Sequence, residues 1–224
     1  MSHRSPLSFG RLSVLMLSLC LLAACGRGVP TGAPVVVAGD SVMAWNRSQG
    51  ASVADQLQAR LGVEVGDVSL PLARVTGGRG PLNIPAQLEG LRTDWVVLNG
   101  GANDLSTCDC TNCDGVLNTL ISEDGRGGAI PALVADLRAR GARVIWADYY
   151  TSPRYAGTAC AATYEQLETR LERMAARDAG VTLVDMDDVF RPDDPTLFAR
   201  DRVHPSPRGS ARIAGLIAPV VVGR

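Results

Sequence analysis

Three side chains in this sequence are of types that together could carry out nucleophilic chemistry at an acyl group. Ser41 follows an apolar run in PVVVAGDSVMAW, and a serine hydroxyl becomes a good nucleophile only when a base takes its proton. His204 is the one candidate base, because the other histidine, His3, lies in a leader-like segment. Asp201 stands three residues before His204, and a tight turn at that spacing can bring a carboxylate to the inner ring nitrogen.

A fourth candidate lies in NGGANDL, where Asn103 comes shortly after an apolar run. Acyl transfer passes through a tetrahedral oxyanion, and an asparagine amide is a suitable fixed donor for it. Each of these residues also has an ordinary structural interpretation. Asn and Asp favour turns, Ser206 could cap a helix after His204, and a single histidine is usually a surface residue.

The elements that must position these residues alternate along the chain. Apolar runs predict five strands, and amphipathic patterns such as Ile130, Leu133, Val134 and Leu137 predict helices between them. The expected strands are 34–39, 63–70, 94–100, 142–150 and 181–186, and the expected helices are 50–62, 84–92, 129–141, 163–180 and 206–221.

This alternation predicts an α/β fold with a parallel sheet that is covered on both faces, because the strands are nearly continuous apolar runs. In such folds the site forms from loops at the carboxyl ends of the strands. Ser41 and Asn103 both follow predicted strands, so they are expected at the same edge of the sheet.

The order of GDS, GAND and DRVHP along the chain resembles the GDSL or SGNH family of serine esterases and lipases, from Val35 to Val221. The resemblance implies that Ser41 is the nucleophile and its N–H an oxyanion donor. It also implies that Asn103 is a second donor, His204 the base and Asp201 its orienting partner. The implied fold is a three-layer α/β/α sandwich of about five parallel strands, and no metal or organic cofactor is implied.

One segment, GDVSLPLARVTGGRG, departs from the family pattern. Leu72 stands where the family usually has a glycine whose N–H completes the oxyanion hole. The leucine would either crowd the acyl pocket or require a different backbone, and Gly78, or its neighbour Gly77, is the alternative donor. Asp67 also stands where the family often has asparagine.

The first residues resemble a bacterial lipoprotein signal. Two arginines precede a short apolar core that ends in LAAC, so residues 1–24 are expected to be removed and Cys25 to carry lipid. The alternative is a plain secretory signal with a chance cysteine. Residues 25–34 are expected to form a flexible tether and 35–224 the hydrolase domain. The protein is then expected in the cell envelope, on the periplasmic face of the outer membrane.

Composition excludes one class of partner and leaves the cysteines with three interpretations. The chain has no lysine and its arginines are scattered, so no nucleic-acid surface is expected. An even number of cysteines in an exported protein favours two disulfides, although a zinc site and a redox CxxC remain alternatives. The four cysteines concerned are Cys108, Cys110, Cys113 and Cys160, and we expect Cys160 to pair with one of the other three.

The sequence therefore predicts an exported serine hydrolase of carboxylic esters. A short acyl group is preferred, because the Leu72 side chain would shrink the pocket, and O-acetyl groups on envelope glycans are one such substrate. Two alternatives remain open: an inactive envelope protein that binds a glycan or acyl group, and a metal or redox module built on the cysteines.

Overall fold

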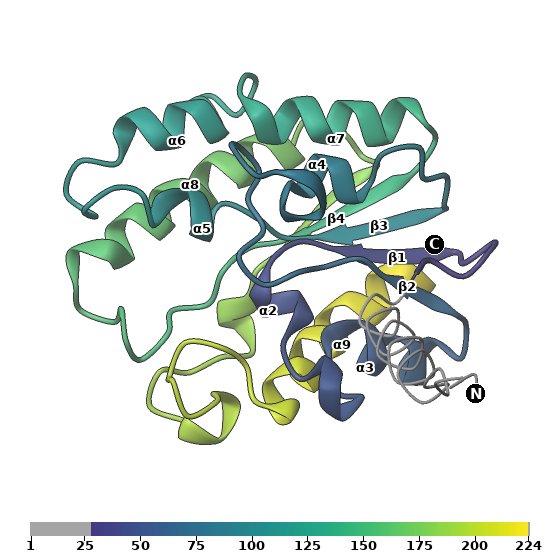
Figure 1. Cartoon of the computed structure of the whole chain (residues 1–224). Helices are drawn as coiled ribbons and strands as arrows, with labels where there is room; N and C mark the ends of the chain where they lie inside the picture. Colours follow the sequence, from purple (N-terminus) through teal and green to yellow (C-terminus); the bar gives the residue numbers. More distant parts are fainter. Residues whose placement is uncertain (1–27, 224) are drawn as a thin grey trace, which may run out of the picture.

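The chain folds around a parallel five-stranded sheet (Figure 1). The structure is a computed structural model that describes residues 28–223. The strand order is β2-β1-β3-β4-β5, and each neighbouring pair is parallel. The predicted α/β class and parallel sheet are confirmed. The strands are β1 (Val35–Ala38), β2 (Val65–Asp67), β3 (Trp95–Leu98), β4 (Arg143–Ala147) and β5 (Val181–Val184).

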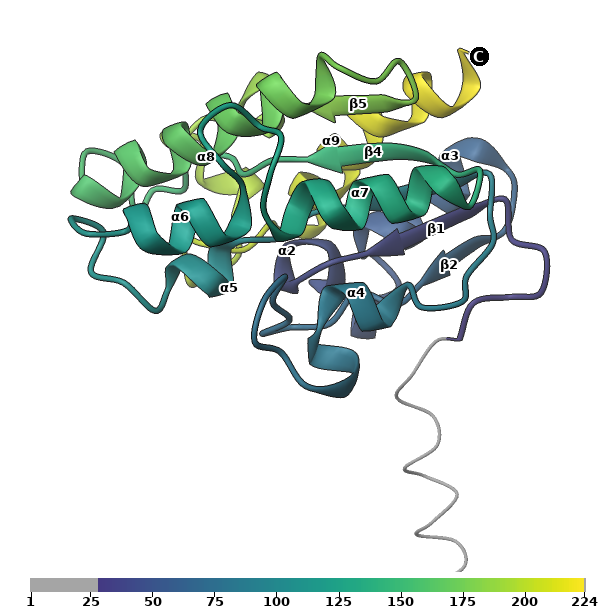
Figure 2. The same cartoon turned by 90° about the horizontal axis from the view of Figure 1, so that it is seen from above.

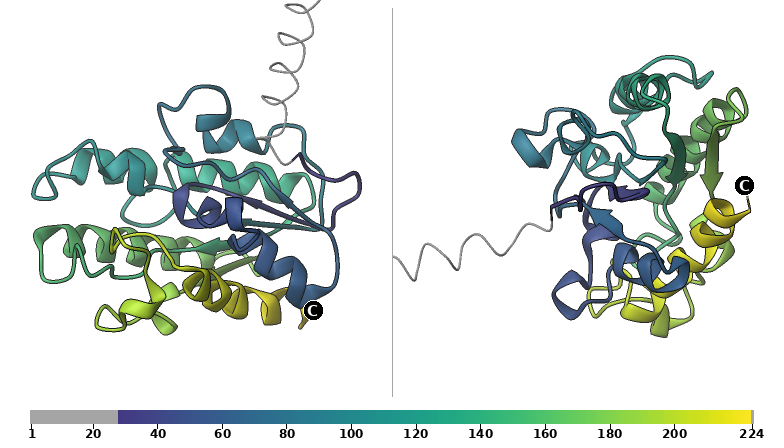
Figure 3. Two further views of the ribbon diagram at one scale, coloured as in Figure 1. Left: turned by 60° about the horizontal axis from the view of Figure 1, so that its bottom comes forward. Right: turned by 90° about the vertical axis from the view of Figure 1, so that its right-hand side faces the viewer.

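Alternate strand residues supply two hydrophobic cores, one on each face of the sheet. Val36, Val96 and Val144 belong to the core under α4, α6, α7 and α8, whereas Val35 and Val97 belong to the core under α3 and α9. Figures 1, 2 and 3 show the resulting three layers, with α3 and α9 together on one side. These helices are α3 (Val53–Leu61), α4 (Ile84–Gln87), α6 (Asp114–Leu120), α7 (Ala129–Ala139), α8 (Ala159–Ala175) and α9 (Pro207–Val222).

Shorter elements lie mainly at the carboxyl ends of the strands, where the chain turns back over the sheet. Two short α-helices follow β1 and β3, and the remainder are 3-10 turns. They are α2 (Ser41–Ala44), α5 (Ala102–Leu105), η1 (Arg47–Gln49), η2 (Gly80–Leu82), η3 (Met186–Asp188) and η4 (Pro195–Leu197).

The predicted helices differ from the observed ones mainly at their ends. The helix expected at 84–92 stops at Gln87, because the chain turns at Gly90 in a left-handed conformation with φ 69°. The helix expected at 163–180 begins earlier, at Ala159, and ends at Ala175, where a turn leads into β5. Leu167, Leu171 and Met174 are buried on its inner face, as the periodicity predicted.

Two residues in the later part of the expected tether pack on the domain. Val29 packs against the core beside Gly66, where a Cβ would lie 3.0 Å from Val29 Cγ1, and Ala33 is buried, with its carbonyl accepting a hydrogen bond from the Thr93 hydroxyl. The expected signal peptide and Cys25 lie outside the described residues. Within residues 28–223, no helix has both the length and the apolar character needed to span a membrane.

Candidate active site

Ser41, His204 and Asp201 form one hydrogen-bonded series, although 163 residues separate the serine from the histidine. The Ser41 Oγ lies 2.8 Å from His204 Nε2, and His204 Nδ1 lies 2.6 Å from Asp201 Oδ2. The structure therefore brings together the three residues that the sequence analysis placed in a nucleophile, base and orienting role.

The turn after β1 presents Ser41 because the two residues before it are fixed. Gly39 has φ 122°, and a Cβ at this position would lie 2.1 Å from the side-chain oxygen of Asn99. Asp40 caps the short helix α2 by accepting a hydrogen bond from the Val42 N–H. Ser41 is therefore the first residue of α2, at the carboxyl edge of the sheet.

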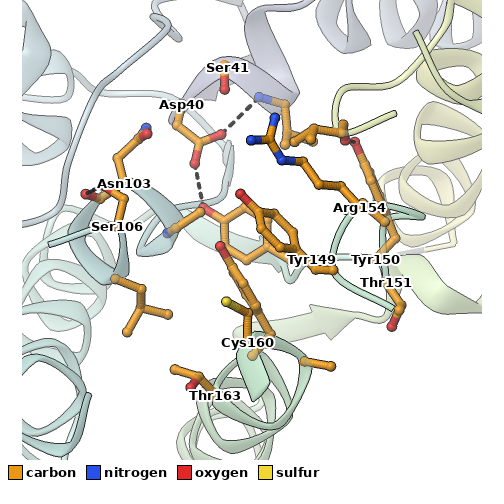
Figure 4. A pocket seen from close by; sticks show the side chains of 18 of the residues that line it. Asp40, Ser41, Asn103, Ser106, Tyr149, Tyr150, Thr151, Arg154, Cys160 and Thr163 are labelled. Atoms are coloured by element: carbon orange, nitrogen blue, oxygen red, sulfur yellow. Dashed lines mark hydrogen bonds between the residues drawn. The ribbon is translucent and has the colours of Figure 1, made fainter. Parts of the chain in front are cut away.

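Asp40 is held by a buried network that the sequence analysis did not predict (Figure 4). Its carboxylate accepts hydrogen bonds from the Asn99 amide and the Tyr149 hydroxyl, and Tyr149 in turn accepts one from the Ala102 N–H. Burial raises the pKa of Asp40, and these hydrogen bonds only partly oppose that shift. The signal in the sequence was the position of Tyr149, just after the fourth strand.

The loop before α9 fixes the position of His204. Asp201 Oδ1 accepts hydrogen bonds from the N–H groups of Val203 and His204, and the His204 carbonyl accepts one from Ala199. Burial of Asp201 acts to raise its pKa, but the hydrogen bonds from His204 and Val203 outweigh it and lower the pKa below its ordinary value. Asp201 therefore stays ionised at neutral pH.

The stacking of Trp45 on His204 is a second contact that was not predicted from the sequence. The indole ring stacks on the His204 imidazole, with ring centroids 3.6 Å apart and planes 5° apart. This contact restrains rotation of the imidazole away from Ser41. Trp45 is the residue after α2, so the same short helix carries the serine and the ring that holds its partner.

Three candidate oxyanion donors border the cavity next to Ser41: its own N–H, the Leu72 N–H and the Asn103 amide. In the described part of the chain, no group accepts a hydrogen bond from the first two. The Asn103 amide nitrogen donates to the Ala73 carbonyl at 2.9 Å, which holds it beside Leu72. An NH₂ group has a second hydrogen, which remains available for a ligand.

Leu72 stands where the family usually has glycine, and its backbone adopts the left-handed conformation that glycine favours. Its φ is 67°, in the left-handed region that costs a branched or bulky residue energy. Its side chain is 70% exposed at the cavity edge. Of the two outcomes expected for this leucine, the structure shows the altered backbone rather than a side chain buried in the pocket.

Gly78 does not take the place of Leu72. It packs against the carbonyl of Leu82, and it is not among the residues that line the cavity. Asp67, which stands where the family often has asparagine, is buried, and its carboxylate makes a bidentate ion pair with Arg47.

The loop with Leu72 and the loop with Asn103 are joined by Asp104. Its buried carboxylate accepts hydrogen bonds from the N–H groups of Val75 and Thr76 and from the Thr76 hydroxyl. The Asn-Asp pair of GAND therefore has two tasks: Asn103 faces the cavity, and Asp104 ties the neighbouring loop to it.

A cavity of about 580 Å³ opens beside Ser41. Two disulfides, Cys108–Cys113 and Cys110–Cys160, lie along it. The disulfide interpretation of the four cysteines is therefore the one that the structure shows, and Cys160 pairs with Cys110. Figure 4 shows Cys160 and Thr163 on one wall, Tyr149, Tyr150 and Arg154 on another, and Asn103 opposite them.

Solved structures with the same fold include several hydrolases. A GDSL-like lipase from Bacteroides thetaiotaomicron has a TM-score of 0.58 at 16% identity, over 92% of this chain and 96% of that one. LAE5, an alpha/beta hydrolase enzyme from the metagenome of Lake Arreo, has a TM-score of 0.61 at 19% identity, over 86% and 95%.

A family two carbohydrate esterase from Clostridium thermocellum also matches, with a TM-score of 0.58 at 16% identity. The match covers 85% of this chain and 63% of the esterase. No curated protein matched the chain. The model of the GDSL-like Lipase/Acylhydrolase family matches residues 37–212, which include the four motif residues described above. The chain therefore belongs to this family and is a serine hydrolase that acts on ester bonds.

Proposed function

We propose that the protein cleaves carboxylic esters through a catalytic triad of Ser41, His204 and Asp201, with Asn103 and the N–H groups of Ser41 and Leu72 as oxyanion donors. The observation that carries this proposal is the continuous contact from Ser41 Oγ to His204 Nε2 at 2.8 Å and from His204 Nδ1 to Asp201 Oδ2 at 2.6 Å. This is the geometry that a serine needs in order to lose its proton as it attacks.

In the first half of the reaction, the Ser41 oxygen attacks the ester carbonyl carbon while its proton moves to His204 Nε2. Asp201 accepts the hydrogen bond from Nδ1–H, which fixes the tautomer and stabilises the imidazolium. The carbonyl oxygen becomes an oxyanion and receives hydrogen bonds from the three donors. The carbon–oxygen bond to the alcohol then breaks, and the imidazolium gives its proton to the departing oxygen.

In the second half, a water molecule replaces the alcohol. His204 takes a proton from the water, and the resulting hydroxide attacks the acyl carbon on Ser41. The second oxyanion uses the same donors. When it collapses, the carboxylic acid leaves, and the proton on His204 returns to Ser41 Oγ. The enzyme is then in its starting state.

The substrate proposed here is an ester with a short acyl group, such as an O-acetyl group on a glycan. A likeness to a carbohydrate esterase supports the general class of alcohol. The steric reason for preferring a short acyl group is weaker than expected, because the Leu72 side chain is mostly exposed. A cavity of about 580 Å³ is within the size range of ligand sites in general. Acyl length is therefore the variable to measure first.

We also propose that the protein is exported and carries lipid on Cys25. The support is the sequence of the leader and the presence of two disulfides, which form and persist in oxidising compartments. The outer-membrane address is an extension of the same proposal, since Gly26 after Cys25 gives no aspartate-type retention signal.

The decisive experiment is labelling of the full-length chain with a fluorophosphonate probe, which reacts with activated serines. We expect labelling at Ser41 and its loss in Ser41→Ala and His204→Ala. In a separate assay, hydrolysis of a chromogenic nitrophenyl ester should fall by roughly 10⁶-fold in either variant. Ser152→Ala is the matched control, because Ser152 is a buried serine that lines the same cavity.

Two results would contradict the proposal. Failure of the folded wild type to react would indicate an inactive site and favour the glycan-binding alternative, which glycan titration would then test. Labelling that persists in Ser41→Ala would place the nucleophile elsewhere. An ester series of increasing acyl length, run on the active protein, tests the short-chain preference separately.

A further inference from the structure

Three acidic side chains gather at the carboxyl ends of the last two strands, apart from the triad. Asp148 follows β4, Asp185 follows β5, and Glu168 projects from α8. One carboxylate oxygen from each lies within 4.8 Å of the other two. Asp148 is only 1% exposed, and Glu168 and Asp185 are half-buried. Three ionised carboxylates at these separations would repel one another, so the cluster binds either protons or a cation.

The hydrogen bonds around Asp148 point to the same need. Its Oδ1 accepts a hydrogen bond from the Met186 N–H, whereas its Oδ2 is buried and has no partner in the described part of the chain. None of the ion pairs between described residues includes Asp148, Glu168 or Asp185. A buried carboxylate oxygen without a partner is rare in folded proteins, and an unseen ion or water is a common explanation.

Burial and mutual repulsion raise the pKa values of the clustered carboxyl groups, as expected where such groups gather without a cation. Burial is the main reason that the pKa of Asp148 is raised to about 8; the Met186 N–H opposes the shift, and the charges of Asp185, Glu168 and Asp187 add to it. Burial and acidic neighbours likewise raise the pKa of Glu168 to about 7. A proton on Asp148 would neutralise one carboxylate, whereas a divalent cation interacts with all three.

We propose that Asp148, Glu168 and Asp185 form a calcium-binding site. The ligands are all oxygens, and Ca²⁺ binds carboxylate oxygens at about 2.3–2.6 Å. Two oxygens on opposite sides of such an ion lie up to about 5 Å apart, which accommodates the 4.8 Å limit of this cluster. Mg²⁺ requires about 2.0–2.1 Å and stricter octahedral geometry, so it fits the wider separations less well.

The position of the site suggests what the ion would do. Glu168 also lines the cavity beside Ser41, and Asp187, just after Asp185, holds the Thr151 N–H and hydroxyl on the cavity wall. An ion here would join the ends of β4 and β5 to α8. It would hold the wall of the cavity opposite the oxyanion donors and take no part in the proton transfers.

The test is calorimetric titration of the chelator-treated, full-length protein with CaCl₂, beside MgCl₂. We expect one Ca²⁺ per chain, with a Kd in the range of about 10⁻⁵–10⁻³ M, weaker binding of Mg²⁺, and a higher melting temperature with Ca²⁺. Absence of saturable Ca²⁺ binding up to a concentration of about 10 mM, well above the range expected for such sites, would overturn the proposal.

Substitutions of the proposed ligands test whether these residues bind the ion. Asp148→Asn and Glu168→Gln should each weaken Ca²⁺ binding at least tenfold and remove the rise in melting temperature. Glu64→Gln is the control: it is the same substitution at an exposed position just before β2, at the opposite edge of the sheet from β4 and β5, and it should bind Ca²⁺ like the wild type. Equal Ca²⁺ binding in the wild type and both site variants would place the ion elsewhere and refute the assignment.

Glu168→Gln keeps the test decisive if Asp148→Asn folds poorly, because the Glu168 side chain makes no hydrogen bond with another described residue and only its backbone takes part in α8. Asp148→Asn itself should melt no lower than the wild type in the presence of chelator, since the amide keeps the acceptor for the Met186 N–H and replaces only the carboxyl oxygen that has no partner. A large loss of stability in chelator would mean that both carboxyl oxygens of Asp148 already have partners within the protein, which contradicts the proposal.

Discussion

Asp201 accepts three hydrogen bonds in a tight turn, and only one of them comes from the imidazole ring. The other two come from backbone N–H groups and shape the turn. An asparagine at this position could keep the Oδ1 contacts to the backbone while losing the negative charge beside Nδ1. The asparagine variant would therefore keep the fold of the turn while removing the charge beside the imidazole. This makes Asp201→Asn a sensitive test of the proposed triad.

We expect Asp201→Asn to lower kcat by about 10⁴-fold, because the histidine loses its charge partner and its preferred tautomer. Burial acts to raise the pKa of Asp201, but the hydrogen bonds from His204 and Val203 outweigh it and lower the pKa, so Asp201 stays ionised over the usual assay range. Its contribution to stability is present above the unfolded pKa of about 3.9 and is lost as the pH falls through the lower, folded value. The measurement is kcat/KM against pH, with melting temperature on the same samples.

Asp194→Asn is the matched control for this loop. Asp194 caps a 3-10 turn by accepting hydrogen bonds from Thr196, and it does not line the cavity. Its variant should retain wild-type kcat. Equal activity of Asp201→Asn and the wild type would remove Asp201 from the proposed mechanism.

The strained backbone at Leu72 predicts a stabilising substitution. With φ at 67°, Leu72→Gly should relieve about 1–2 kcal/mol of left-handed strain, partly offset by the greater freedom of glycine in the unfolded chain. The N–H donor is retained, so kcat for an acetyl ester should change less than tenfold. Thermal melting and ester kinetics measure the two effects.

Leu72→Ala distinguishes backbone strain from the loss of the side chain. It keeps a Cβ at the same φ, so it should gain little stability. If both variants lose activity by more than a hundredfold, the leucine side chain itself positions the substrate, and the donor role of its N–H no longer explains this position.

At the scale of elements, the two disulfides differ in what they connect. Cys108–Cys113 closes a separation of 5 residues within the segment between α5 and α6, whereas Cys110–Cys160 spans 50 residues and joins this segment to the start of α8. Thr163 adds a further contact by donating to the Cys110 carbonyl. Only the longer bridge links two walls of the cavity.

Loss of the longer bridge should therefore cost more. Chain entropy predicts about 4 kcal/mol for Cys110→Ser/Cys160→Ser and about 2 kcal/mol for Cys108→Ser/Cys113→Ser. Denaturant unfolding of the two double variants measures this difference, and ester kinetics at low denaturant should show a higher KM for the first. A larger loss of stability in the second variant would show that strain or local structure, rather than loop closure, governs these bridges.

Four of the five strands were predictable from sequence because they are mainly apolar runs between helical patterns. β2 (Val65–Asp67) contains Gly66 and Asp67 and was recovered only as part of the longer predicted strand 63–70. The helices α5 and α6 were not predicted, because they are short and lie beside cysteines whose pairing a sequence does not specify. The contacts of Asp40 with Tyr149 and of Trp45 with His204 were not predicted either, although the position of Tyr149 at the end of a strand placed it at the correct edge of the sheet. They join residues 109 and 159 positions apart, and neither residue type is diagnostic of such a contact.

For the whole molecule, the order of the strands explains why so few motifs were enough to locate the site. β1 and β3 are neighbours in the sheet, so the loops that carry Ser41 and Asn103 emerge side by side. α9 packs on α3, on the same face of the sheet as the Ser41 helix, which brings the loop with His204 to Ser41. Motifs far apart in sequence are adjacent because of this topology.

The proposed lipid anchor gives a prediction for the whole chain. Cys25→Ser should abolish incorporation of labelled palmitate in a bacterial host and move the protein from the membrane fraction to the soluble fraction. Cys20→Ser, within the expected apolar core of the signal, is the control and should remain lipidated. Unchanged membrane association of Cys25→Ser would favour another mode of attachment.

The stacking of Trp45 on His204 has an optical consequence. A protonated imidazole quenches indole fluorescence at contact distance, and these ring centroids are 3.6 Å apart. The other two tryptophans, Trp95 and Trp146, are buried in strands of the sheet, so their emission should form a steady background. The emission of Trp45 should therefore follow the charge of the histidine directly, in stopped-flow as well as at equilibrium, and report each gain and loss of its proton without a dye or a chromogenic ester.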